Sequence, residues 1–149
     1  MPPPDGGGRG AGVVPLRLAL LEAGCWSLAD AEPTLRWIAA RQNDDGGFGE
    51  SDLSFTAKDF VPGPSTAFQT AFVAEALIAH ERLSGVPTEL RPTLGRAVVW
   101  LKARADATDG WMTEESHAGV ALQETWYIDY ELLPLYVTLI VLNDYAALA

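Results

Sequence analysis

The sequence holds one cysteine and two histidines in 149 residues. A lone Cys25 cannot form an intramolecular disulfide and is typical of a reducing compartment, so we expect a cytoplasmic protein. Cys25, His80 and His117 are not joined by any short metal-ligand spacing. We therefore expect no metal site and no cofactor, and we interpret Cys25 as a small buried apolar residue.

Positive charge is also scarce. Ten basic residues against twenty acidic ones give a formal net charge of -10, and the pI is near 4.4. Nucleic-acid binding requires a basic stripe, so this balance argues against it. An acidic surface repels anionic lipid, so a peripheral membrane contact would have to be hydrophobic. Long apolar runs and a recognisable signal peptide are missing too, which fits a cytoplasmic location.

What the sequence does contain is a regular supply of apolar residues at helical spacing. Residues 1–11 are rich in proline and glycine, and we expect a flexible segment there. Residues 12–149 form one helical domain in this interpretation, with about six helices, no convincing strand and an all-α fold. Five of them are expected at about 13–23 (ending at Gly24), 30–42, 66–83, 92–104 and 130–147.

Local signals place the helix starts. Asp30 is the expected N-cap of the second helix, with Pro33 in its first turn, where a missing N–H costs nothing. Thr66 and Gln69 form a T-x-x-Q capping box for the helix at 66–83. Residues 49–64 show no period, and we expect an ordered, non-helical connection.

Two helices are apolar on nearly every side. In the helix at 66–83, Phe68 and Phe72 belong to one stripe while other apolar residues cover the rest of its circumference. The helix at 130–147 has the same character, and such helices are buried on most sides.

A helix–turn pattern occurs twice, about sixty residues apart. In the first copy, at 33–48, Gln42 follows a helix and can bond the backbone groups that a helix end leaves free. Gly46 and Gly47 permit a tight reversal, and Asp44-Asp45 is interpreted as a turn with Asx hydrogen bonds. The second copy, at 96–111, keeps Gly110-Trp111 but has Ala105 where the glutamine should stand.

The aromatic-rich segment at 123–130 allows two interpretations. Trp126 and Tyr130, one helical turn apart, can face a cavity and stabilise a cation with their π-faces. Packing in the core is the alternative, and it is the commoner role of such aromatic residues. Glu124 and Asp129 are candidate acid or base groups, although solvation at the surface is the commoner fate of such residues.

The repeated pattern of apolar helix, Gln, Asp/Gly turn and aromatic resembles the QW motif of squalene-hopene and oxidosqualene cyclases. Residues 41–51 (RQNDDGGFGES) look like a full QW turn with Phe in place of Trp. Residues 64–79 are similar to the family's Pro-Ser-Gln-Thr-Ala helix, and 125–145 to its closing segment. Residues 10–14 look like the glycine-rich start of an inner helix. The resemblance implies part of an (α/α) toroid of helix hairpins around a hydrophobic cavity.

The resemblance also implies roles for individual residues. The structural QW residues are Gln42, Gly47, Phe48, Gly110 and Trp111. The candidate cavity residues that would contact a hydrophobic isoprenoid are Trp126, Tyr130, Phe68, Gln69 and Leu122. The family's enzymes protonate an isoprenoid alkene with an aspartic acid in a D-x-D-D motif. No D-x-D-D occurs in this sequence, and we assign no catalytic residue.

The functional expectation is one part of a split class II terpene cyclase whose D-x-D-D acid lies on another polypeptide. About six helices make roughly half a toroid, which would leave the faces of helices 66–83 and 130–147 open. We therefore expect a homo- or hetero-oligomer, with the D-x-D-D-bearing subunit as partner. The alternatives are a non-catalytic module that binds an isoprenoid or a partner helix, and an inactive cyclase fragment.

Overall fold

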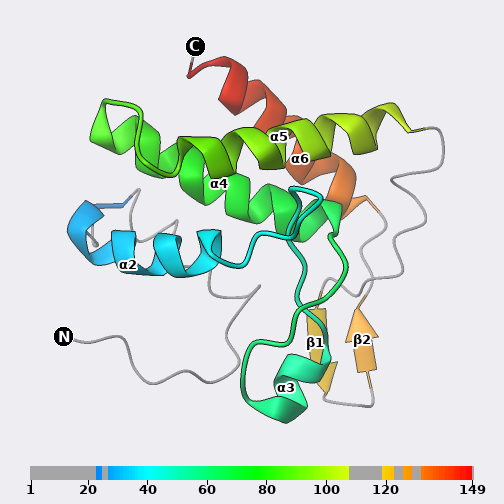
Figure 1. Ribbon diagram of the computed structural model, residues 1–149. Coiled ribbons are helices and arrows are strands. Elements are labelled where there is room, and N and C mark those ends of the chain that lie inside the picture. The colour runs from blue at the N-terminus through cyan, green and yellow to red at the C-terminus, as the bar shows by residue number, and fades with distance from the viewer. Residues whose placement is uncertain (1–22, 25–26, 108–118, 123–125, 129–131, 149) are drawn as a thin grey trace.

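The computed structural model describes residues 23–24, 27–107, 119–122, 126–128 and 132–148 (Figure 1). The helices in this part are α2 (Leu28–Ala39), α3 (Leu53–Ala57), α4 (Ala67–Ser84), α5 (Arg91–Asp106) and α6 (Leu133–Ala146). The strands are β1 (Gly119–Leu122) and β2 (Trp126–Ile128). The all-α class is confirmed. The flexible segment expected at 1–11 and most of the helix expected at 13–23 lie outside the described residues.

Helix α4 is the centre of the core. Helices α2, α5 and α6 all pack against it (Figure 1), and most of its residues are buried. Leu77 and Ile78 of α4 are fully enclosed, as are Leu94 and Leu101 of α5 and Val141 of α6. The expectation of an open face on the helix at 66–83 is therefore wrong, because three neighbouring helices cover it.

Helix α2 begins earlier than its sequence suggests. Ser27 is the N-cap: its Oγ accepts the Asp30 N–H at 3.2 Å, and the Asp30 carboxylate accepts the Ser27 N–H at 3.4 Å. The expected N-cap, Asp30, is thus the third helical residue of a capping box. The hydrogen bond from the Ser27 hydroxyl lowers the pKa of Asp30. Pro33 lies inside α2 rather than in its first turn, with its ring exposed to solvent.

The start of α4 matches half of its predicted capping box. The Thr66 hydroxyl accepts the Gln69 N–H at 3.4 Å, as expected for an N-cap. The Gln69 side chain bonds the backbone of Glu50 instead of returning to Thr66. At the other end Gly85, with φ of +71°, terminates α4 and donates its N–H to the Glu81 carbonyl at 3.1 Å.

Two irregular segments contain regular structure that the sequence pattern does not reveal. The connection at 49–64, expected to be non-helical, includes the short helix α3, whose C-cap Lys58 adopts the left-handed conformation. Strands β1 and β2 form an antiparallel pair, which stands apart from α2, α4, α5 and α6 in Figure 1. The expectation of no strand is wrong here, because pairing across a hairpin can stabilise runs too short to show a period of two. Helix α6 begins at Leu133 rather than at residue 130.

None of the helices in the described part of the chain has the length and apolar character needed to cross a bilayer.

Candidate functional site

Gln42 fastens the turn after α2 to the start of α5. It follows α2, and its Nε2 donates to the Gly46 carbonyl at 2.8 Å and to the Thr93 carbonyl at 2.9 Å. Thr93 lies in the first turn of α5, 51 residues further along the chain. Gln42 therefore bonds backbone carbonyls, but not those at the end of its own helix. One amide links the turn after α2 to the start of α5.

The turn that Gln42 closes is held from the α5 side as well. Gly46 has a φ of +95° and donates its N–H to the Asn43 carbonyl at 2.9 Å. The guanidinium of Arg96, on α5, donates to the carbonyls of Asn43 at 2.9 Å and Asp44 at 3.1 Å. Two carbonyls of the turn thus have a cationic partner on α5.

Asp45 is the polar hub of this turn. Its Oδ1 accepts the Gly47 N–H at 2.9 Å and the Ser65 hydroxyl at 2.7 Å, and its Oδ2 accepts the Trp100 indole N–H at 3.0 Å. Burial alone would raise the pKa of Asp45, but these three donors and the nearby Arg96 charge lower it below its usual value. Asp45 is therefore a structural anion, in agreement with the interpretation of Asp44-Asp45 as a turn with Asx hydrogen bonds.

The glycines of the turn allow main chains to touch. A Cβ on Gly47 would lie 2.5 Å from the Ser65 Cβ and 3.0 Å from the Trp100 ring. On Gly49 it would lie 1.8 Å from the Pro64 carbonyl oxygen. The segment after α2 and the segment before α4 therefore pack backbone to backbone.

Phe48 closes the turn with its side chain in the core, 4% exposed. Its N–H donates to the Thr70 hydroxyl at 2.9 Å, and its carbonyl accepts the Thr66 N–H at 3.0 Å. We call Gln42, Asp45, Phe48, Arg96 and Trp100 the clasp. These residues join α2, the start of α4 and α5 into one unit.

Two of the cavity candidates lie near the start of α4. Phe68 is buried, 2% exposed, and packs edge to face on Phe72 with ring centroids 6.3 Å apart. The Gln69 Oε1 accepts the Glu50 N–H at 2.6 Å, and its Nε2 donates to the Glu50 carbonyl at 3.3 Å. In this arrangement Gln69 ties α4 to the connection at 49–64. The substrate contacts expected of both residues stay predictions.

The structure brings the backbones of two further candidates together. Leu122 on β1 and Trp126 on β2 are partners across the hairpin. The helical spacing argued for Trp126 and Tyr130 is wrong at Trp126, because this residue lies in a strand. Tyr130, together with Gly110 and Trp111 of the second copy, lies outside the described residues.

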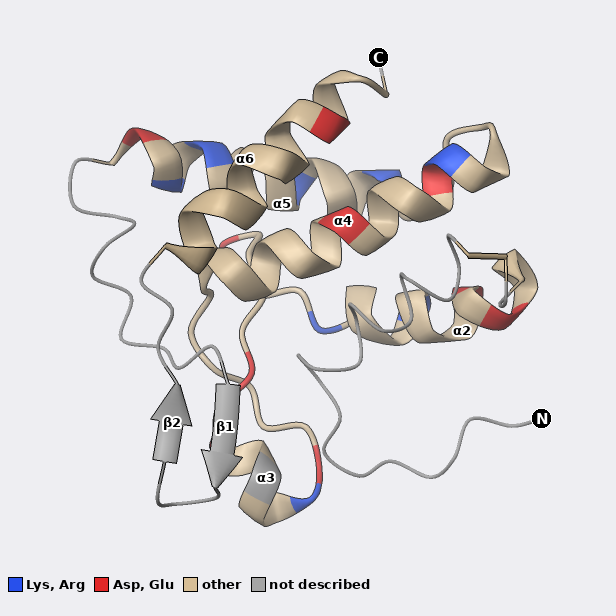
Figure 2. Cartoon of the chain, turned by 180° about the vertical axis from the view of Figure 1, so that it is seen from behind, with Lys and Arg blue, Asp and Glu red and all other residues tan. Residues whose placement is uncertain are grey.

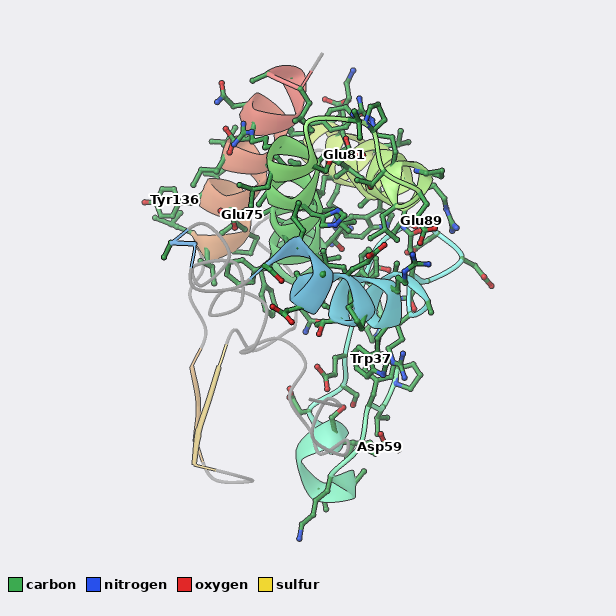
Figure 3. All side chains as sticks on the ribbon, turned by 90° about the vertical axis from the view of Figure 1, so that its left-hand side faces the viewer. Trp37, Asp59, Glu75, Glu81, Glu89 and Tyr136 are labelled. Atoms are coloured by element: carbon green, nitrogen blue, oxygen red, sulfur yellow. The ribbon has the colours of Figure 1, made fainter. Side chains whose placement is uncertain are left out.

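Sequence reasoning missed the partners of the turn. Arg96 and Trp100 stand in the second copy of the repeat, and their spacing of four on α5 is the signal that indicates a shared face. A cation–π cluster beside the clasp was missed too: the Arg41 guanidinium lies 3.5 Å from the Trp37 ring centroid and 5.2 Å from that of Phe60. Trp37 extends from α2 toward the connection at 49–64 (Figure 3). This cluster fixes that connection to α2.

Metal coordination has no candidate in the described ranges, where no three His, Cys, Asp or Glu side chains gather. In the clasp, Gln42 and Arg96 donate to backbone carbonyls, and Trp100 donates to the Asp45 carboxylate. These bonds are structural: they hold α2 and α5 together.

Residues 23–147 match the family described as squalene-hopene cyclase C-terminal domain. A squalene–hopene cyclase of Bradyrhizobium diazoefficiens is 31% identical over 96 residues, which are 63% of this chain and 14% of that protein. No solved structure matches the chain.

Two fungal proteins are similar as well. The terpene cyclase–glycosyl transferase fusion protein fsoA of Humicola fuscoatra is 38% identical over 85 residues, 54% of this chain and 6% of that protein. The terpene cyclase/mutase ntnI of a Nectria species is 26% identical over 108 residues, 70% of this chain and 14% of that protein. The chain thus spans no more than 14% of the length of these relatives. By the match over residues 23–147, it belongs to the squalene-hopene cyclase C-terminal domain family.

Proposed function

We propose that this chain forms one wall of the hydrophobic cavity of a terpene cyclase, and that the acid that starts the reaction lies on another polypeptide. The observation that carries the proposal is the family match over residues 23–147 in a sequence without a D-x-D-D motif. The named relatives are squalene–hopene and terpene cyclases, so the substrate class is an isoprenoid alkene.

Each part of the chain has a role in this proposal. An acid on the partner protonates the alkene, and the carbocation that forms needs apolar walls that exclude water and π-faces that stabilise positive charge. Trp126 and Tyr130 are the residues proposed to supply the π-faces, with Leu122 and Phe68 among the apolar lining. The clasp holds α2, α4 and α5 rigid, so that the cavity keeps its shape around a reactive intermediate.

The test is recovery of the tagged chain from its own host, followed by assays of the purified chain and of any stoichiometric complex. We expect a partner that carries D-x-D-D, cyclisation of squalene or a prenyl diphosphate by the pair, and no cyclisation by the chain alone. Trp126→Leu in the pair should slow cyclisation or change its products without loss of binding to the partner. Cyclisation by the purified chain alone would overturn the proposal.

A second candidate is a non-catalytic module that binds an isoprenoid or a partner helix. The exposed apolar residues of α6 favour it. Recovery of the chain without a D-x-D-D partner, together with saturable binding of squalene, would support this function over the split cyclase.

A further inference from the structure

Helix α6 is uncharged along nearly its whole length. From 132 to 143 the sequence contains no Asp, Glu, Lys or Arg, and Figure 2 shows a single acidic position near the C-terminal end of α6. One side of the helix packs on α4 through Pro134, Val137, Thr138 and Val141, all buried. This side accounts for only part of its apolar surface.

The opposite side of α6 is apolar and exposed. Leu132 is 45% exposed, Tyr136 55%, Leu139 57% and Ile140 50%. Their spacing of four, three and one places them on one side of the helix, and Tyr136 points away from α4 in Figure 3. We call these four residues the α6 stripe. Val99 of α5 is even more exposed, at 69%, but has no such row of exposed apolar neighbours on its helix.

Helix α6, which carries the stripe, is bonded to α4. Near its C-terminal end, Asp144 accepts hydrogen bonds from Arg82 of α4 through its side chain at 3.3 Å and its carbonyl at 3.2 Å. The ion pair between the two side chains has a shortest distance of 3.2 Å. The one acid on α6 is therefore engaged with α4, and the stripe itself offers a partner no charge, only apolar contact and the Tyr136 hydroxyl.

We infer that the α6 stripe binds an apolar helix, flanked by basic residues, of the polypeptide that carries the acid; this inference rests on the proposed function. A stripe one helix wide matches the surface of another helix. The chain's net charge of -10 favours a partner whose flanks are basic. Tyr136, an aromatic near the middle of the stripe, is the expected anchor residue.

The same observations count against other occupants. A second copy would bring two chains of net charge -10 together. Anionic lipid would be repelled by the acidic chain.

The experiment uses the full tagged chain in its own host, with the photo-crosslinking residue p-benzoylphenylalanine in place of Tyr136. A matched chain carries the same residue in place of Val99. After irradiation and purification, the adducts are identified by mass spectrometry. We expect an adduct from position 136 within an apolar, basic-flanked helical segment of the D-x-D-D polypeptide, and none from position 99.

A pair of charge substitutions gives an independent measurement. Ile140→Glu should reduce recovery of the partner at least about ten-fold, as loss of a central apolar contact does, whereas Val99→Glu should leave it within about two-fold. Circular dichroism of both variants checks that the helices are retained. A folded Ile140→Glu chain that recovers the partner normally would overturn the inference.

The outcomes separate this inference from the proposed function. If the D-x-D-D partner is recovered but cross-links only from position 99, the inference fails and the proposed function stands. An adduct with a second copy, with lipid or with residues 1–22 of the same chain would also overturn the inference. If no D-x-D-D partner is recovered, both fail.

Discussion

At the scale of single residues, the Gln42 amide joins segments that lie 51 residues apart. Gln42→Ala removes two hydrogen bonds to carbonyls, and we expect the free energy of unfolding to fall by about 1–2 kcal/mol. Gln42→Glu keeps the shape but presents a carboxylate to the carbonyls of Gly46 and Thr93, so it should cost at least as much at pH 7. Urea denaturation measures both. A Gln42→Glu variant as stable as the parent chain would contradict the role of the amide as donor.

Asp45 makes the stability of the clasp depend on pH. Its pKa in the folded chain is lowered below the unfolded value of about 3.9. Its contribution is therefore present at pH values above the unfolded pKa and is lost as the pH falls through the folded pKa. We expect Asp45→Asn to lower the free energy of unfolding at pH 7 by about 1 kcal/mol, with the difference disappearing in acid.

Denaturation of the parent chain and of Asp45→Asn between pH 7 and pH 3 measures this dependence. The control is Asp44→Asn at the exposed neighbouring position, which we expect to change stability by less than about 0.5 kcal/mol. A constant difference between Asp45→Asn and the parent across this range would show that the charge of Asp45 is not what holds the turn.

At the scale of elements, replacing either of two glycines with alanine should change stability in opposite directions. A Cβ on Gly49 would lie 1.8 Å from the Pro64 carbonyl oxygen, so Gly49→Ala must push apart the segments before α3 and before α4. We expect it to cost about 3 kcal/mol or more. Gly95, inside α5, has nothing within 4 Å of its Cβ position, so Gly95→Ala should stabilise the chain by about 0.5–1 kcal/mol through helix propensity.

Thermal unfolding of the two glycine variants checks both signs. A small effect of Gly49→Ala on the Tm would mean that the segments containing Gly49 and Pro64 can move apart at little cost in free energy.

The last turn of α4 contains a buried charge. The Glu81 side chain is 4% exposed and forms an ion pair with Arg91, and its Oε1 accepts the Thr88 N–H at 3.3 Å. Glu81 and its hydrogen-bonding neighbour Arg91 lie where α4, α5 and α6 come together, since Arg91 also lies 5.5 Å from the Tyr145 ring. Arg91→Ala leaves this buried carboxylate without its cation, which is costly.

The matched control is Arg36→Ala, because Arg36 pairs with Glu32 and Glu89 at the surface. In Figure 3, Glu81 lies near the C-terminal end of α4, and Glu89 lies apart from it, beside α5. We expect Arg91→Ala to lower the Tm by roughly three times as much as Arg36→Ala does, because exposed pairs contribute little. Similar falls in Tm would mean that Glu81 is adequately solvated without Arg91.

At the scale of the whole molecule, every chain exposes the apolar α6 stripe. The net charge of -10 makes separate chains repel one another at pH 7. Near the pI of 4.4 the net charge vanishes, and we expect the isolated chain to self-associate there through the α6 stripe. Ile140→Lys should reduce light scattering at pH 4.4. Val99→Lys adds the same charge away from the stripe and should reduce it much less. Equal effects of the two variants would point to charge alone.

Much of the fold follows from local features of the sequence. The helical period and the Thr66 N-cap predict α4 to within a residue or two, and the period alone predicts most of α5. The turn at 43–47 is predicted by its composition. The strand pair and α3 are not, because runs of three to five residues carry no measurable period. The sequence suggests Asp30 as the N-cap of α2, because aspartate is common at that position. The N-cap is Ser27, three residues earlier, and Asp30 is the third helical residue.

The sequence by itself determined the helical class, the family resemblance and the position of Gln42, since each of these lies in a short run of residues. Only the tertiary structure decided which carbonyls Gln42 bonds, that Gln69 is held by Glu50, that α4 is enclosed by three helices and that one side of α6 is left exposed. The physical reason is that these outcomes depend on which helices pack together. A helix that is apolar on every side has no polar face in its sequence to indicate which side meets the core.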